Sequence, residues 1–250
     1  MDANQKIPWP RIAVEGAAII ASILLAFSID AWWGNKQQHN AEQVVLETLL
    51  EDLRDKQDLL DEMNRYSQAI VDSIEVLLRV GAGSQEKPSN EMIDRLIGDT
   101  WWESNDALWE SAPMNLLVAG GNLSVITNPT LVQELGSLQV ALDRVRNHYQ
   151  KDQKFHQEIM TPFIMSHTNM IQIIAAMRHR PGFPDDPGVP KVNVDAINSF
   201  DHSKLLSTLE FQNLLAAKME RQLDILATGH PGVEKHLSVV ISMLENDLDD

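Results

Sequence analysis

The chain has 250 residues, which is long enough for one well-packed core or two smaller ones, because the buried share of the surface grows with size. Its formal net charge is −16, and −15 of this falls on residues 34–250, which disfavours binding to nucleic acid or to anionic lipid headgroups. The absence of cysteine excludes disulfides, thiolate metal sites and thiol nucleophiles, and is compatible with a reducing compartment or a bacterial periplasm.

The first predicted element is a membrane-spanning helix over residues 12–33. Residues 16–29, GAAIIASILLAFSI, contain no charge, and 22 helical residues at about 1.5 Å each cover about 33 Å, the thickness of a hydrocarbon core. Trp9 on one side and Trp32 and Trp33 on the other lie where aromatic belts anchor such helices at the membrane interface. The pattern therefore favours a transmembrane anchor over a buried helix of a soluble protein.

A cleaved signal peptide is the other alternative for this segment. It requires a small-residue cleavage site after its apolar core, whereas this core ends in Asp30 and Ala31 followed by two tryptophans. We therefore expect the segment to be retained, with Asp30 marking its outer boundary.

The orientation of the anchor follows from the basic residues that flank it. Lys6 and Arg11 precede the helix, and Lys36 is the basic residue that follows it closely. This predicts a short cytoplasmic tail of residues 1–11 and an acidic extracytoplasmic domain of residues 34–250, which would lie in the periplasm or outside the cell.

Two features of the anchor indicate contact with another helix. Ala18, Ser22 and Ala26 are spaced by four and form a ladder of small residues that permits close approach of helices. Glu15 is an ionisable group in or beside the membrane, four residues after Arg11. We favour an assembly contact for Glu15 over a proton or ion site.

The N-terminal pattern resembles a family of uncharacterised bacterial single-pass membrane proteins, in which a Glu-led apolar helix ends near a tryptophan and a helical domain of unknown function follows. The resemblance covers about the first 60 residues, including LLEDLRDKQDLL, and more loosely ALWESAPMNLLVAGGNLSVITNPTLVQEL. Asp30 and Ala31 depart from the amide-rich pair usual in that family. The resemblance implies an inner-membrane location and no particular activity. The residues that carry it are Glu15, Ile19, Ile20, Ile23, Leu24, Leu25, Ala26, Phe27, Ile29, Asp30 and Trp32.

Residues 34–250 predict an antiparallel bundle of long, coiled-coil-like helices, so the whole chain is expected to be all-α. A helix over residues 41–80 has ten positions spaced by three and four, eight of them apolar, which indicates a packing seam. Residues 81–90 form a loop, and Ser89 or Asn90 caps the next helix. The ten positions are Leu46, Leu49, Leu53, Lys56, Leu60, Met63, Ser67, Ile70, Ile74 and Leu77.

The later helices follow from capping residues and prolines. A helix over residues 91–117 carries Trp101, Trp102 and Trp109. Trp102 and Trp109 are seven residues apart and share a face, which we assign to a bundle core rather than to a ligand site or a second membrane contact. Asn128 and Pro129 open a helix that reaches Arg178, with a kink or division at Pro162. A proline-rich connector over residues 180–191 precedes two final helices, over residues 203–227 and from Pro231 onward.

The seam of the helix after Pro129 becomes polar in its second half. His148, Asp152 and His156 are spaced by four and could present two imidazoles and a carboxylate to a metal ion. Continuing the seam places Asp152 and His156 inward before Ile159, and we favour a structural interpretation over a metal site. Either the register shifts to Phe155 and Ile159 and leaves a solvated polar face, or the polar pair fixes the register of the bundle.

These patterns favour an interaction protein. We expect a non-catalytic accessory or scaffold subunit that binds other membrane-protein subunits, with self-association as a further option, and that requires no cofactor. One alternative is an energy-coupled component that uses Glu15 as a proton or ion site. Another is a metal-dependent periplasmic sensor or enzyme built on His148, Asp152 and His156.

Overall fold

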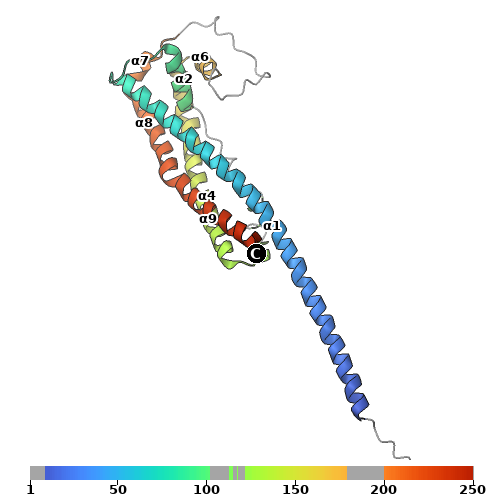
Figure 1. Cartoon of the computed structure of the whole chain (residues 1–250). Coiled ribbons are helices and arrows are strands. Elements are labelled where there is room, and N and C mark those ends of the chain that lie inside the picture. The colour runs from blue at the N-terminus through green and yellow to red at the C-terminus, as the bar shows by residue number, and fades with distance from the viewer. Residues whose placement is uncertain (1–8, 102–112, 115–116, 118–121, 179–199, 250) are drawn as a thin grey trace, which may run out of the picture.

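A computed structural model describes residues 9–101, 113–114, 117, 122–178 and 200–249, with the side chains of helix α1 described from Ile19 onward. Figure 1 shows a bundle of helices from which one long helix projects. Every regular element within the described residues is a helix, and none of these residues lies in a strand. The prediction of an all-helical fold is confirmed.

Helix α1 (Trp9–Gly81) has 73 residues and is about 110 Å long at about 1.5 Å per residue. Its first part projects beyond the bundle and its second part packs within it (Figure 1). The described side chains are exposed from Ile19 to Ala41, and burial begins at Glu42. The prediction of separate helices over residues 12–33 and 41–80 is wrong at their junction. The helix continues through Gly34, because one glycine costs only about 1 kcal/mol and helix extension is cooperative.

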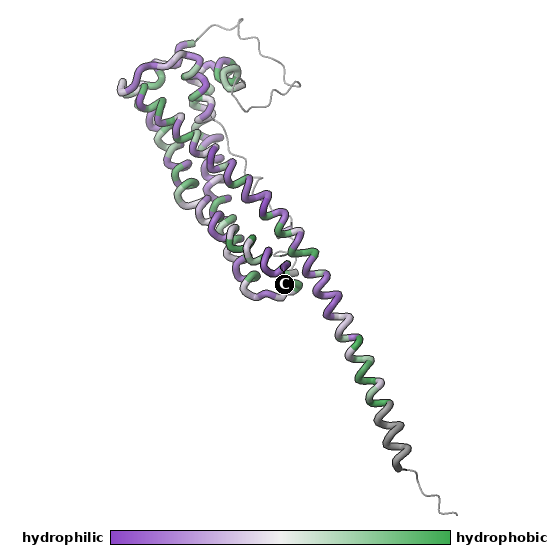
Figure 2. Tube along the Cα trace, in the orientation of Figure 1, coloured by the Kyte–Doolittle hydropathy of each residue, from purple (hydrophilic) through white to green (hydrophobic). Residues whose placement is uncertain are grey.

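The projecting part of α1 contains a hydrophobic stretch followed by a hydrophilic one, as Figure 2 shows. Among the residues whose side chains are described, no helix has both the length and the mean hydropathy of a membrane span. The predicted span over residues 12–33 extends beyond those residues, and its membrane assignment stays a prediction.

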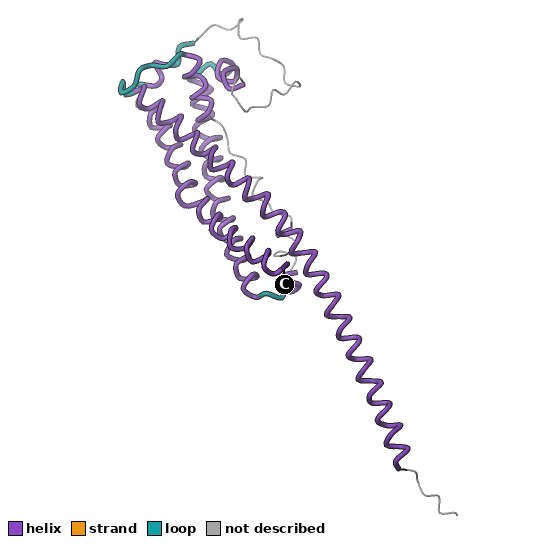
Figure 3. The backbone as a smooth tube through the Cα atoms, in the orientation of Figure 1, coloured by secondary structure: helices purple, strands orange, loops and turns teal. Residues whose placement is uncertain are grey.

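Within the described residues, the helices of the bundle that follow one another directly are joined by short loops and turns (Figure 3). Two of the junctions are π-helical turns, η3 and η5, which join their neighbouring helices without a break. The elements after α1 are α2 (Asn90–Trp101), the 3₁₀ helix η2 (Asn122–Val125), α4 (Pro129–Phe155), η3 (His156–Met160), α5 (Thr161–His167), α6 (Met170–Arg178), α7 (Ser203–Leu206), α8 (Leu209–Asp224), η5 (Ile225–Gly229) and α9 (His230–Asp249).

The helices α8 and α9 run antiparallel to α4. Glu134 near the start of α4 contacts His236 of α9, whereas Asp152 near its end contacts Lys218 of α8. Residue numbers therefore rise along α4 while they fall along its neighbour. The predicted packing of antiparallel helices is present in this part of the bundle.

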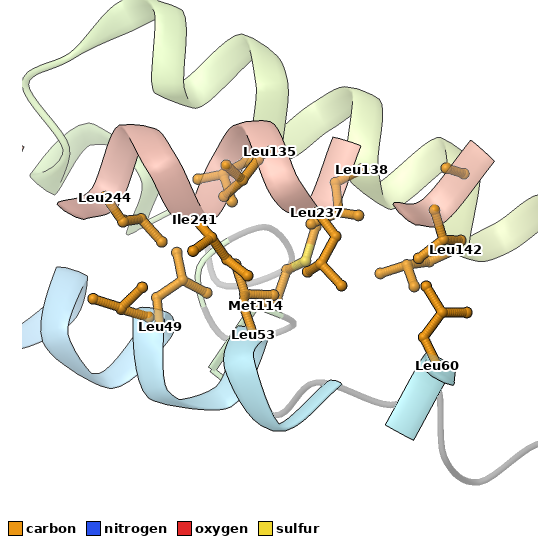
Figure 4. Close-up of a cluster of buried hydrophobic side chains, with 14 of the residues drawn as sticks. Leu49, Leu53, Leu60, Met114, Leu135, Leu138, Leu142, Leu237, Ile241 and Leu244 are labelled. Carbon is orange, nitrogen blue, oxygen red and sulfur yellow. The ribbon is translucent and has the colours of Figure 1, made fainter. Parts of the chain in front are cut away.

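Two clusters of buried apolar side chains form the core. The proximal cluster lies nearer the projecting part of α1, and Figure 4 shows its side chains pointing toward one another from α1, α4 and α9. The distal cluster lies at the far end of the bundle. The proximal cluster includes Leu49, Leu53, Leu138, Leu142, Leu237 and Ile241, and the distal cluster includes Ile74, Ile97, Ile164, Ile173, Phe211 and Leu215.

The predicted seam of α1 is confirmed. Nine of its ten positions are buried, and Lys56 is half-buried. The loop before α2 is also confirmed, since residues 82–89 lie between the helices and the Ser89 hydroxyl accepts a hydrogen bond from the Met92 N–H at 3.2 Å. Of the tryptophans assigned to the next helix, Trp101 is half-buried at the end of α2, and Trp102 and Trp109 lie outside the described residues.

The boundaries of the later helices differ from the prediction. Asn128 caps α4 through hydrogen bonds to the N–H groups of Thr130 and Leu131, as expected. The helical run ends after His167, whereas at Pro162 it continues from the π-helical turn η3 directly into α5. The predicted helix over residues 203–227 is divided at residues 207 and 208 into α7 and α8, and α8 then continues through η5 and Pro231 into α9 without the predicted break. The connector over residues 180–191 lies outside the described residues.

Alanine substitutions at two glycines test how closely the helices of the bundle pack. A Cβ atom on Gly81 would lie 2.1 Å from the carbonyl oxygen of Leu206, whereas one on Gly136 would meet no atom within 4 Å. We expect Gly81→Ala to destabilise the protein by about 1–3 kcal/mol through overpacking. We expect Gly136→Ala to stabilise it by up to about 1 kcal/mol through helix propensity. Urea unfolding of both variants measures this difference, and equal shifts would contradict the packing at Gly81.

Candidate functional site

A layer of polar side chains separates the two apolar clusters. On α1, Met63 belongs to the proximal cluster and Ile70 to the distal one, and polar residues lie between them. The same change occurs on α4 between Tyr149 and Phe155. We call this group the central polar layer, and it consists of Asn64 and Ser67 of α1, Tyr149 and Asp152 of α4, Lys218 and Gln222 of α8, and His230 of α9.

An ion pair between Asp152 and Lys218 lies at the centre of this layer. The Lys218 Nζ atom is 2.6 Å from Asp152 Oδ2, and the side chains are 0% and 1% exposed. The Gln222 Nε2 atom donates a second hydrogen bond to the same oxygen at 3.0 Å. A charge in a protein interior is tolerated only when it is paired and hydrogen bonded, so this geometry fixes α8 against α4 at one register.

His230 joins three helices in the same layer. Its Nδ1 atom lies 2.6 Å from Asn64 Oδ1, and its Nε2 atom lies 2.7 Å from the Tyr149 hydroxyl. The Asn64 oxygen can only accept, so Nδ1 carries the proton and Nε2 accepts from Tyr149. Ser67 in turn hydrogen bonds to the Tyr149 side chain. Helices α1, α4 and α9 are thereby connected through one neutral imidazole.

Burial changes the acidity of both aromatic groups. Desolvation lowers the pKa of His230 from 6.5 to about 4, because the imidazolium would lose its hydration. Desolvation raises the pKa of Tyr149, an effect that the Ser67 hydrogen bond reduces and the nearby Asp152 charge increases. Both groups are therefore neutral near pH 7. This arrangement suits structural specificity rather than proton transfer.

The three residues considered for a metal site have separate roles. Asp152 points inward, as predicted, and pairs with Lys218. His156 is also buried, but its Nε2 atom lies 3.1 Å from the Thr161 hydroxyl, and its ring lies against Trp101 with the ring centroids 5.8 Å apart. His148 is half-buried. Within the described part of the chain, no three His, Cys, Asp or Glu side chains are grouped as metal ligands.

The predicted inward position of Ile159 is wrong. Its side chain is 53% exposed, whereas Met160 and Ile164 are fully buried. The cause is the π-helical turn η3, which adds one residue to the helical turn and shifts the seam by one position. The alternative register through Phe155 and Ile159 is correct for Phe155 alone.

The described anchor residues lie on an exposed surface. Trp32 and Trp33 are 59% and 56% exposed, and Lys36 lies over the Trp32 ring at 5.4 Å. The Ser28 hydroxyl donates to the Leu24 carbonyl at 2.8 Å, which satisfies its polar group within the helix. Ser22, Ala26 and Asp30 are exposed, and the side chains of Trp9, Arg11, Glu15 and Ala18 lie outside the described residues.

A second buried polar cluster closes the distal end of the bundle. His202 Nδ1 lies 2.5 Å from Asp94 Oδ1, and His202 Nε2 accepts from the N–H of Asn169 at 2.9 Å. Gln172 Nε2 donates to Asp94 Oδ2 at 2.9 Å. Both imidazole nitrogens are occupied by protein groups. This His–Asp pair therefore fastens the segment around residue 202 to α2 rather than serving as a general base.

Two adjoining depressions lie on the surface near this cluster. One has a volume of about 600 Å³ and is lined by the end of α5, the start of α6 and Phe200. The other, of about 400 Å³, shares His167 and Phe200 with it and includes Lys204 of α7. Both are open to solvent at the distal end of the bundle.

The sequence interpretation missed Lys218, Gln222 and His230. A signal for the first two was present, because Phe211, Leu214, Lys218 and Gln222 follow the three-and-four spacing of a buried seam. Nothing local identifies their partners, since Lys218 and Asp152 are 66 residues apart in the chain.

Comparisons with protein-family models, with curated proteins and with solved structures found no match to this chain. The resemblance to a family of single-pass membrane proteins therefore stays a prediction, and any function must be argued from the geometry.

Proposed function

We propose that this chain is a non-catalytic, membrane-tethered accessory or scaffold subunit that docks onto a larger membrane-protein assembly. One observation carries the proposal: the projecting part of α1 exposes nine large apolar side chains within residues 19–33. Their exposed fractions range from 50% to 67%. They are Ile19, Ile20, Ile23, Leu24, Leu25, Phe27, Ile29, Trp32 and Trp33.

An exposed apolar surface of this extent is expected to be covered by lipid or by another protein. The largest apolar patch on an ordinary soluble monomer is about 300–600 Å², and single exposed apolar residues are usually scattered. Here the apolar side chains surround one helix, and the described part contains one charge, Asp30. A lipid bilayer covers such a helix on all sides, and a partner helix covers one side of it.

The residues next to this stretch support a membrane boundary. Trp32 and Trp33 end the apolar stretch, and an exposed polar helical segment, residues 34–41, separates it from the first buried side chain. This segment covers about 12 Å at about 1.5 Å per residue, which exceeds the Debye length of about 8 Å at physiological salt. The acidic bundle would therefore be separated from anionic headgroups by more than this screening length. Under the proposed orientation it would lie in the periplasm.

The length and fixed register of the bundle favour a role as a scaffold over a role as an enzyme. From Glu42 to Gly81, α1 covers about 60 Å, and the central polar layer fixes its neighbours at one register along this length. A stiff rod of this kind would hold its distal end at a set height above the membrane. Other membrane-protein subunits, or further copies of this chain, are the proposed partners.

Cell fractionation tests the tether. We expect the full chain in the membrane fraction, and we expect Leu24→Asp combined with Leu25→Asp to release it. Each acidic residue at the centre of a spanning helix costs about 2.5–3.5 kcal/mol. A matched control, Val44→Asp with Val140→Asp, changes two equally exposed apolar residues of the bundle, at 63% and 61%, and should stay membrane-bound.

The membrane fraction from the same cells tests whether the chain docks onto other membrane subunits. After gentle solubilisation, the wild-type chain should co-purify with other membrane subunits, and Ser22→Leu on the small-residue face should reduce their recovery. Recovery of the wild-type chain in the soluble fraction without detergent would overturn the tether. Unchanged co-purification of the Ser22→Leu variant would count against docking through this face.

A further inference from the structure

Two solvent-facing helix surfaces in the middle of the bundle carry opposite charges. On α4, the exposed side chains of Arg144, Lys151 and Lys154 share one face of the helix, which we call the cationic face. On α8, the exposed side chains of Glu220 and Asp224 are spaced by four and share another, which we call the acidic face. We propose that copies of this chain associate side by side, with the cationic face of one copy against the acidic face of the next.

The charges of both faces are unpaired within the described part of the chain. None of the five side chains forms an ion pair with another described residue. Asp143, at the edge of the cationic face, is held by Arg146 at 2.9 Å. The next carboxylate on this side of the helix, Glu158, lies beyond the cationic face in η3. Both faces can therefore direct their charge at an external partner.

The charge balance of the chain explains why a second copy fits the cationic face. The chain contains 36 acidic and 20 basic residues and has a net charge of −16. Two copies that met through acidic surfaces would bring like charges together, which disfavours association. The cationic face of α4 replaces this repulsion with attraction at one place on the surface. A second copy of the chain offers the complementary charge.

The two faces lie at the same height along the bundle. Lys218 of α8 donates to Asp152 of α4 at 2.6 Å, and the two helices run antiparallel. Glu220 is therefore level with Lys151 to within one helical turn, and Asp224 follows one turn nearer the proximal cluster. Copies tethered to one membrane by α1 stand at equal heights, so the two faces meet without axial displacement. This step rests on the proposed tether.

Exposed apolar side chains border both faces. Val140, one turn before Arg144, is 61% exposed, and Leu223, next to Asp224, is 43% exposed. A contact between α4 and α8 would cover both of them and add apolar burial to ion pairs that contribute little individually. Because the two surfaces differ, the contact is heterologous, and its repetition gives a closed ring or an open row of copies.

Disulfide trapping between two differently tagged full chains tests the contact, since the natural chain contains no cysteine. One chain carries Asn147→Cys on the cationic face, and the other carries Leu223→Cys beside the acidic face. With one cysteine in each chain, an intramolecular disulfide is excluded. We expect mild oxidation of membranes that contain both chains to give the mixed dimer, because a disulfide requires Cα atoms within about 7 Å.

Asn213→Cys in place of Leu223→Cys is the matched control. It changes another exposed residue of α8, about 15 Å along the helix from Leu223 at about 1.5 Å per residue, and should give no dimer above random collision. Absence of the mixed dimer between Asn147→Cys and Leu223→Cys, or equal trapping by Asn213→Cys, would overturn the proposal.

Charge reversal tests whether the two faces recognise each other electrostatically. Arg144→Glu with Lys151→Glu in the first chain should lower the yield of the mixed dimer by at least about fivefold. Glu220→Lys with Asp224→Lys in the second chain should then restore the yield. All four side chains are exposed, so these variants should keep their fold.

Failure of the doubly reversed pair to recover would also contradict the contact. Fractionation of the same cells reports the tether separately. Membrane-bound chains that give no mixed dimer would therefore contradict the side-by-side contact and leave the tether intact.

Discussion

Replacing Asp152 with leucine is expected to lower the free energy of unfolding by about 3–5 kcal/mol, because it leaves the Lys218 ammonium buried without a counter-charge. Lys218 is 0% exposed and lies 2.6 Å from the carboxylate, so water cannot replace the lost partner. Gln222 also loses the acceptor of its 3.0 Å hydrogen bond. Urea unfolding of the full chain in detergent, followed by circular dichroism, measures the change.

A double-mutant cycle separates two quantities. One is the net contribution of the Asp152–Lys218 pair to the free energy of unfolding, and the other is the destabilisation caused by leaving one charge buried without its partner. Asp152→Leu combined with Lys218→Met replaces both charges with apolar groups of similar size, and we expect it to recover most of the lost stability. The exposed pair of Arg79 and Glu75, at 2.9 Å, serves as a control. Arg79→Met should change stability by less than about 1 kcal/mol. A double variant as unstable as Asp152→Leu alone would contradict the central polar layer.

Lowering the pH is expected to reduce the free energy of unfolding of the bundle through protonation of His230. The pKa of this group falls from 6.5 to about 4 on folding, so between these values the unfolded chain binds a proton that the folded chain does not. The contribution to stability is fully present above pH 6.5 and is lost as the pH falls to about 4. Linkage gives a loss of about 3 kcal/mol over this range. Urea unfolding at a series of pH values measures it.

A comparison between variants isolates this histidine from the many carboxylates that titrate in the same range. His230→Gln should be less stable at pH 7 because Tyr149 and Asn64 lose well-placed partners, and its disadvantage relative to wild type should shrink by about 3 kcal/mol by pH 4. A constant difference between wild type and His230→Gln would show that His230 is not buried as a neutral group.

The central polar layer gives the two apolar clusters a shared register. Apolar side chains alone permit helices to slide by a turn at small cost, whereas a buried ion pair is satisfied at one position only. The proposed scaffold role depends on this stiffness, because a rigid bundle would hold a partner at the distal end at a fixed distance from the anchor. The same layer explains why α4 and α8 contain buried charges despite their cost.

The amino-acid sequence alone determined the features that depend on local periodicity. The seam of α1 was predictable because apolar residues recur every three or four positions, and the same spacing placed Asp152 and His156 inward. The Asn128 cap of α4 was predictable because its hydrogen bonds reach only two and three residues along the chain. Each of these features involves neighbours within a few residues.

Only the tertiary structure decided which groups meet. Asp152 pairs with Lys218 rather than with a metal ion, and His230 joins Asn64 to Tyr149, because helices distant in the chain lie side by side. The π-helical turn at η3 moved the seam from Ile159 to Met160, since the packing of the whole bundle outweighs the local preference for regular helix. Periodicity fixes the face of a helix, but long-range contacts fix its partner and its register.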